Sequence, residues 1–139
     1  MQLVDTNILS ELMRPQPNAG VLAWLLGRER VNPRLKVSVV TVDEIMFGLS
    51  WHPTSRLLTW FYAFVQRHEV LPITCDIARR AGELRGQLQA SGQTRTQADM
   101  LIAATAQIHA LTIVTRNVRD FDGCGIGVLN PFTGSSGSP

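Results

Sequence analysis

The sequence predicts an α/β protein: a three-layer α/β/α sandwich built on a mainly parallel sheet. Two observations lead to this fold class. Short apolar runs alternate with segments of helical periodicity along nearly the whole chain, as expected when each strand is followed by a crossover helix. The strands are continuous apolar runs, which is typical of strands covered by helices on both faces.

Length and composition fit one globular domain of 139 residues. The chain is 45% hydrophobic and 17% charged, which argues against disorder, and no apolar run approaches the roughly 18 residues of a membrane span. The N-terminus shows no basic segment followed by an apolar one, so we expect no signal peptide and a cytoplasmic protein. Cys75 and Cys124 stand far apart, which argues against a disulfide framework or a zinc site.

The pattern of apolar residues predicts the elements in chain order. The expected order is a strand at 3–4, helices at 8–13 and 17–27, a strand at 37–40, helices at 41–49 and 54–67, a strand at 69–73, helices at 76–90 and 97–109, and strands at 111–115 and 125–129. The strand predictions rest on short apolar runs rich in β-branched residues. The helix predictions rest on apolar residues three and four positions apart.

Caps and breakers predict where the helices begin and end. Pro15 stops the first helix, and Thr41 with Glu44 three positions later has the form of a capping box at the start of another. The residues Ser91-Gly92 end the helix at 76–90, and Thr96 caps the long helix that follows. We expect residues 1–132 to form the domain and residues 133–139 to form a flexible tail rich in glycine and serine.

Acidic residues stand where predicted strands end or helices begin. Asp5 directly follows the first strand, Glu44 and Asp99 lie in the first turns of two helices, and Asn117 and Asp120 follow a later strand. Because ligand sites in parallel α/β sheets lie beyond the carboxyl ends of the strands, we expect these side chains to meet in one cleft. Carboxylates crowded together repel one another unless a cation lies among them. Mg²⁺ and Mn²⁺ suit such a site, since they need no His or Cys ligand.

Each of these acids also has a structural interpretation. Acids in the first helical turn interact favourably with the helix dipole, so Glu44 and Asp99 could be capping residues, and Asp5 could be an N-cap. Asp5 is the hardest to explain in this way, because a simple cap does not need the further polar residues that follow it. Asp43 points about 100° away from Glu44 on a helix, so only one of the two can face the cleft.

Five segments together resemble a known family. They are MQLVDTNILSE at 1–11, SVVTVDEI at 38–45 with Gly48, ADMLIAATA at 98–106, VTRNVRDF at 114–121, and Asn130-Pro131. This ordered set resembles the PIN-domain family over residues 1–132, and within it the VapC and FitB type of toxin. The resemblance implies a Rossmann-like sandwich with a mainly parallel sheet of five strands. It also implies an Mg²⁺- or Mn²⁺-dependent endoribonuclease that forms a homodimer and is inhibited by a cognate antitoxin protein.

The resemblance also implies roles for individual residues. It places the family's three most regular acids on Asp5, Glu44 and Asp99, with Asp5 and Asp99 as direct metal ligands. Asn117 stands at a fourth position where related families often carry Asp, so a second metal would be weak or held through Asp120. One metal and two metals are therefore both open.

Polar residues around these acids complete the expected site. Asn7 and Thr115 match polar positions that line the family's site. Arg116 and Arg14 are candidates for binding RNA phosphates, in a chain that has twelve arginines and a single lysine. The alternative function is a catalytically weak or inactive PIN-like module that binds RNA or a partner without cutting. Loss of a core acid would mark such a module, and three of the four are present.

Overall fold

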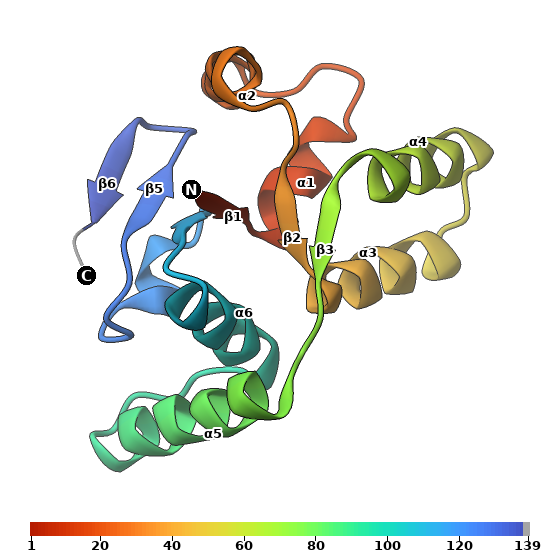
Figure 1. Ribbon diagram of the computed structural model, residues 1–139. Coiled ribbons are helices and arrows are strands. Elements are labelled where there is room, and N and C mark those ends of the chain that lie inside the picture. The colour runs from red at the N-terminus through yellow and green to blue at the C-terminus, as the bar shows by residue number, and fades with distance from the viewer. Residues whose placement is uncertain (138–139) are drawn as a thin grey trace.

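The computed structural model describes residues 1–137 and has the predicted α/β/α arrangement (Figure 1). Its elements in chain order are β1 (Gln2–Val4), α1 (Thr6–Leu12), α2 (Ala19–Val31), β2 (Lys36–Ser38), α3 (Val39–Trp51), α4 (Ser55–Arg67), β3 (Glu69–Leu71), α5 (Cys75–Ala90), α6 (Gln97–Ile108), β4 (Thr112–Val114), the 3₁₀ helix η1 (Val118–Phe121), β5 (Val128–Asn130) and β6 (Ser135–Gly137). Strands and helices alternate as the apolar pattern predicts.

Five parallel strands lie in the order β3, β2, β1, β4, β5 within the described part of the chain. Backbone hydrogen bonds pair β2 with β3 and join β1, β4 and β5, and β1 lies against β2 where these two groups meet. The antiparallel strand β6 extends the sheet beyond β5. The pairs within each group are parallel, and a hydrogen bond from Thr6, just after β1, to Glu44, in the helix that follows β2, places the carboxyl ends of the two groups at the same edge.

Two apolar cores lie on opposite faces of the sheet. In the register of β1 and β4, Leu3 stands opposite Ile113 and Val4 stands opposite Val114. Successive strand residues point to opposite faces, so Leu3 and Ile113 join the core under α5 and α6, whereas Val4 and Val114 join the core under the first four helices. Figure 1 shows α1 and α2 on one side of the sheet and α5 and α6 on the other.

Helix α3 begins earlier than the sequence predicts. Ser38 is its N-cap, and the Ser38 side chain accepts a hydrogen bond of 3.0 Å from the Val40 N–H. The predicted capping box of Thr41 and Glu44 is therefore wrong, as is the placement of Glu44 in the first turn. The strand ends at Ser38 because its hydroxyl can satisfy a free N–H at the helix start. Thr41 is instead buried inside the helix.

The C-terminal segment is more ordered than the sequence predicts. A loose tail was expected at 133–139, but Ser135–Gly137 form β6 and pair antiparallel with β5. Gly134 has a φ of 74°, a conformation that glycine adopts without strain, and it lies in the turn between the two strands. Residues 138 and 139 lie outside the described residues. The division into a domain at 1–132 and a separate tail stays a prediction.

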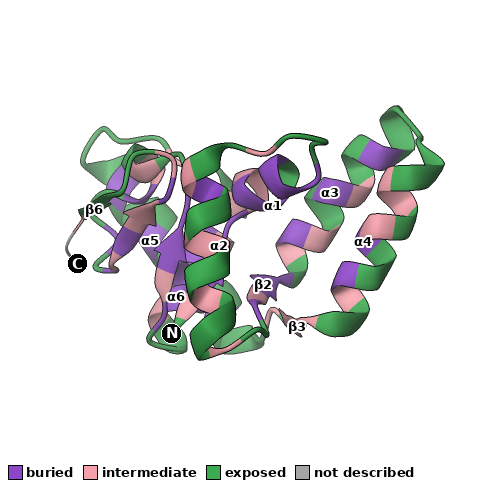
Figure 2. Ribbon diagram, turned by 90° about the horizontal axis from the view of Figure 1, so that it is seen from above, coloured by how far each residue is buried: buried purple, intermediate pink, exposed green. Residues whose placement is uncertain are grey.

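Helix α2 lies on the outside of the molecule. Figure 2 shows it largely exposed. Val21 is its buried residue, whereas Leu26 is 58% exposed. An apolar groove of about 380 Å³ runs between α2 and α4, and its lining includes Leu22, Leu25 and Trp60.

Among the helices of residues 1–137, none combines the length and hydrophobicity needed to cross a bilayer.

The first turn of α2 approaches the C-terminal segment too closely for any side chain. A Cβ on Gly20 would overlap the backbone oxygen of Pro131, whereas a Cβ on Gly27 would meet no atom within 4 Å. We predict that Gly20→Ala lowers the free energy of unfolding by about 1–3 kcal/mol, because backbone has to move. Gly27→Ala, the matched control, should raise it by up to about 1 kcal/mol through helix propensity. Urea denaturation measures both, and a Gly20→Ala protein as stable as wild type would refute the close contact.

Candidate active site

Asp5 stands at the point where β1 ends and α1 begins. Its backbone N–H donates to the Val114 carbonyl at 2.9 Å, which continues the pairing of β1 with β4 by one residue. Its side chain accepts from the Thr6 N–H at 2.8 Å and is the N-cap of α1. The carboxylate is only 4% exposed. Asp5 is thus a capping residue, and it also presents a buried carboxylate at the carboxyl edge of the sheet.

Side chains from two strand ends hold this carboxylate in place. The second Asp5 oxygen, Oδ2, accepts from Asn7 Nδ2 at 3.0 Å and from Thr115 Oγ1 at 2.8 Å. Asn7 Oδ1 in turn accepts from the Arg116 N–H at 2.9 Å, and Thr115 Oγ1 accepts from the Asn117 N–H at 3.0 Å. The structure therefore brings Asn7, Thr115, Arg116 and Asn117 around Asp5.

Glu44 reaches the same place from α3. The Thr6 hydroxyl donates to Glu44 Oε1 at 2.6 Å and lies 3.0 Å from the hydroxyl of the buried Thr41. Thr6 lines the cleft but is not among the site residues that the sequence predicted. Its only signal is its position between Asp5 and Asn7, since a contact across 38 residues leaves no local pattern.

Asp99 reaches the site from the third position of α6, as predicted. Thr96 caps that helix, and Thr96 Oγ1 accepts from the Asp99 N–H at 3.1 Å. Asp5, Glu44, Asp99 and Asn117 line one open cleft of about 470 Å³. The fold thus brings together acids that are separated by up to 94 residues, 99 minus 5, in the sequence.

Asp120 lies beside this cleft and lines a neighbouring hollow instead. It belongs to η1, and its negative charge raises the pKa of Asp99. Asp120 was expected in the same cluster; it lies outside the cleft lining, but its charge still acts on Asp99.

The side chains of Asp5, Glu44 and Asp99 concentrate negative charge in the cleft. The pKa of Asp5 is raised from 3.8 to about 6, mainly by burial; the hydrogen bonds from Thr115 and Thr6 act against this rise, and the nearby charges of Asp99 and Glu44 add to it. Burial also raises the pKa of Asp99, with smaller contributions in the same direction from the charges of Asp120 and Glu44. Within residues 1–137 none of Asp5, Glu44 and Asp99 takes part in an ion pair.

These properties suit a divalent cation. The available donors are carboxylate, amide and hydroxyl oxygens, which Mg²⁺ and Mn²⁺ prefer. A cation would stabilise the charged form of Asp5 and Asp99, which burial and, to a smaller extent, the neighbouring carboxylates disfavour. In the described part of the chain, no group of three or more acidic, His or Cys side chains is arranged to hold a single ion. The assignment of Asp5 and Asp99 as the direct ligands, with Glu44 beside them in the cleft, stays a prediction. Two carboxylates with water fit Mg²⁺, which usually keeps several waters.

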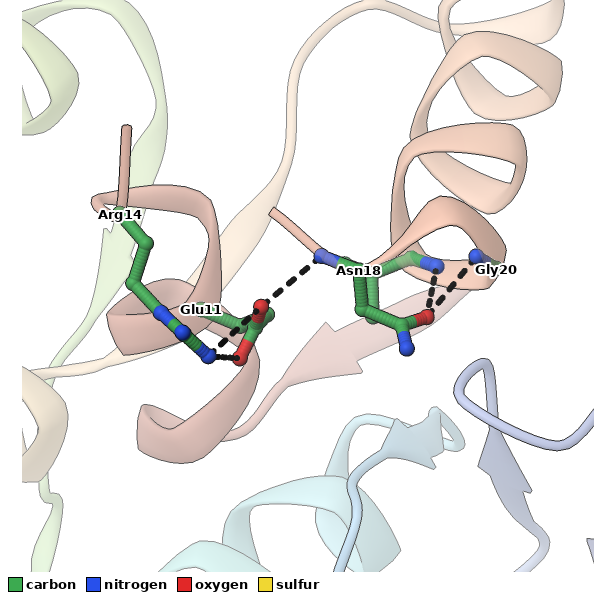
Figure 3. Close-up of polar contacts among 5 residues, drawn as sticks. Glu11, Arg14, Asn18 and Gly20 are labelled. Atoms are coloured by element: carbon green, nitrogen blue, oxygen red, sulfur yellow. Dashed lines mark hydrogen bonds and ion pairs between the residues drawn. The ribbon is translucent and has the colours of Figure 1, made fainter. Parts of the chain in front are cut away.

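Glu11 is a second residue, after Thr6, that sequence reasoning left out of the site. Its side chain is buried, lines the cleft and lies between two partners (Figure 3). It accepts from Arg14 Nη1 at 3.2 Å and from the Asn18 N–H at 2.8 Å, while the Asn18 side chain caps α2. The spacing of Asn7, Glu11 and Arg14 at three and four residues could have indicated a polar helix face toward the cleft.

Comparison with known proteins agrees with this geometry. The PIN domain family model matches residues 3–123. The chain is 33% identical over 139 residues to the VapC ribonuclease Y4jK of Sinorhizobium fredii, covering 95% of this chain and 98% of that protein. Its fold matches the crystal structure of FitAcB from Neisseria gonorrhoeae with a TM-score of 0.81 and 30% identity, covering 95% and 99% of the two chains. The chain belongs to the PIN-domain family.

Within this family the chain is similar to the VapC and FitB type of toxin, which confirms the resemblance seen in its motifs. It also matches a toxin–antitoxin complex from Klebsiella pneumoniae with a TM-score of 0.72 and 29% identity, covering 94% of this chain and 98% of that one.

The raised pKa of Asp5 predicts an unusual pH dependence of stability. The folded state holds this proton up to about pH 6 and the unfolded state only to about pH 3.8, so the folded state binds more protons between these values. In metal-free buffer, the Asp5 contribution to the free energy of unfolding should therefore increase as pH falls from about 7 to about 4, by at most about 3 kcal/mol.

Chemical denaturation across this pH range separates Asp5 from the other titrating groups. Asp5→Asn should show a weaker increase toward low pH than wild type, because Asn does not titrate. Asp43→Asn, which removes an exposed carboxylate one residue before Glu44, is the matched control and should keep the wild-type dependence. Equal pH dependence in wild type and Asp5→Asn would contradict the burial argument.

Proposed function

We propose that this protein is a divalent-metal-dependent endoribonuclease and the toxin of a toxin–antitoxin pair. One observation carries the proposal: three elements bring Asp5, Glu44 and Asp99 to a single cleft at the carboxyl edge of the sheet, without a basic partner among the described residues. The similarity to a VapC ribonuclease supports the same activity.

The proposed reaction is hydrolysis of an RNA phosphodiester bond by water. Asp5 and Asp99 would hold Mg²⁺ or Mn²⁺, which when bound supplies a water of lowered pKa and compensates charge on the leaving oxygen. Thr115 and Asn7 fix the Asp5 carboxylate by hydrogen bonds, so it needs no reorganisation before reaction. Glu44 is exposed toward the cleft, and its bond to Thr6 positions it to orient the attacking water.

Two arginines on the cleft lining are proposed to bind RNA phosphates. Arg116 is exposed, and its guanidinium lies 4.8 Å from the centre of the Phe132 ring. Arg14 is paired with Glu11, yet its side chain is 66% exposed, so it can reach a phosphate from that position. Both guanidinium groups offer several N–H donors to phosphate oxygens.

The proposed partner is a cognate antitoxin whose apolar segment lies in the groove between α2 and α4. Leu22, Leu25 and Trp60 line this groove, which is more apolar than a solvated surface requires. A basic antitoxin side chain over the acidic cleft would compensate the carboxylate charges in place of a metal cation. The matched toxin–antitoxin complex supports such a partner.

We also propose a cytoplasmic homodimer, for which the exposed Phe47 and Trp51 on α3 are a candidate apolar contact.

Cleavage assays test the proposed activity. We predict that wild-type protein cleaves RNA with Mg²⁺ or Mn²⁺, that EDTA abolishes cleavage, and that Asp5→Asn and Asp99→Asn reduce it by about 100-fold or more. Asp43→Asn should cleave like wild type, because Asp43 lies outside the cleft lining. RNA that is bound but never cut by the wild-type protein would instead support the non-cleaving binding module.

Co-purification with the antitoxin tests the groove. The complex should survive roughly 0.5 M salt, because apolar burial is not screened. Leu22→Glu places a charge in the groove lining and should weaken the complex by about tenfold or more. Val31→Glu is the matched control, since Val31 is 81% exposed at the end of the same helix and outside the groove lining. Equal effects of the two variants would place the antitoxin elsewhere.

A further inference from the structure

A second hollow adjoins the acidic cleft. Its volume is about 510 Å³, and Arg116 and Asn117 line both the cleft and the hollow. The rest of its lining comes from η1 and from the turn and strand at the C-terminal end, including Arg119, Thr133 and Ser135. A strand of RNA that leaves the cleft over Arg116 would therefore enter this hollow directly.

The boundary between the two hollows is held in place by hydrogen bonds from several segments. The Arg116 N–H donates to Asn7 Oδ1 at 2.9 Å, and Asn130 Nδ2 donates to the Arg116 carbonyl at 3.4 Å. Asn130 Oδ1 also accepts from the Phe132 N–H at 3.0 Å, which sets the ring below the Arg116 guanidinium. Arg116 is thus fixed at the boundary by contacts that leave its guanidinium exposed.

The hollow offers donors for an anion. Arg116 and Arg119 are both exposed, and neither forms an ion pair within residues 1–137. Thr133 and Ser135 add hydroxyls, which lie 2.7 Å apart across the turn before β6. Asp120 is the one acid in this lining, and its charge already acts on Asp99. The lining therefore differs in charge from the acidic cleft next to it.

We propose that this hollow is a subsite for the backbone phosphates of an RNA strand whose scissile phosphate lies in the acidic cleft. The inference rests on the proposed ribonuclease function and adds the path of the substrate. Arg119 is the arginine that tests the subsite separately from the cleft, because it lines the hollow but not the cleft, whereas Arg116 lines both. The β5–β6 hairpin contributes the hydroxyl side of the subsite.

Binding of RNA by an uncleaving protein tests the subsite. The Asp99→Asn protein, with and without Arg119→Gln, is titrated in Mg²⁺ with labelled RNA of random sequence, of about four and about twelve nucleotides. Arg119→Gln should weaken binding of the longer strand about three- to fivefold and reduce the salt dependence of binding, since one phosphate contact is lost. It should leave the affinity for the shorter strand within twofold, because that strand fits in the cleft alone.

Arg30→Gln in the same background is the matched control for loss of a positive charge. Arg30 is exposed in the last turn of α2, which leads toward the amino end of β2, opposite the cleft. Equal effects of Arg119→Gln and Arg30→Gln on the longer strand, or equal effects of Arg119→Gln on both strands, would overturn the subsite. Failure of the wild-type protein to cleave RNA would instead overturn the proposed function. The failure of the subsite and the failure of the proposed function are therefore distinguishable.

Discussion

The buried carboxylate of Asp5 is the constraint on which the site depends. Its backbone extends the pairing of β1 with β4, one of its oxygens caps α1, and the other accepts from side chains at both strand ends. These donors offset part of the cost of burial, yet the pKa still rises to about 6. The fold thus keeps a carboxylate in an environment that disfavours its charge, which is typical of a functional site.

The arrangement of parallel strands explains why distant residues share this environment. Asp5 and Thr115 each follow a strand, and β1 and β4 are paired neighbours, so the two side chains meet without any long connection. Asp99 arrives at the first turn of a capped helix, where its position is fixed by Thr96. At Arg116 the acidic cleft adjoins the hollow beside the C-terminal hairpin. The lining of the cleft is mainly acidic, whereas the lining of the hollow contains basic and hydroxyl side chains.

The sequence predicted the alternation of strands and helices and the convergence of the acids, because both follow from local pattern and from parallel topology. It could not predict how Glu44 reaches the cleft. The spacing of Thr41 and Glu44 matched a capping box, but the N-cap of α3 is Ser38, three residues earlier. Glu44 instead accepts a hydrogen bond from the Thr6 hydroxyl. The strand β6 was missed for a similar reason, since glycine and serine have low strand propensity and only pairing with β5 orders them. Glu11 was missed because one of its two partners is the backbone N–H of Asn18, seven residues later in the loop before α2, and only the other, Arg14, is signalled by helical spacing.

The central claim is that Asp5 and Asp99 together hold a divalent cation in this cleft. The most direct measurement is a crystal structure of the protein with Mn²⁺, in which anomalous scattering locates the ion. The account predicts a Mn²⁺ peak in the cleft, with oxygens of both carboxylates within roughly 2.0–2.3 Å of it and water completing the coordination. A fully occupied Mn²⁺ site elsewhere, or a cleft without an anomalous peak at saturating Mn²⁺, would contradict it.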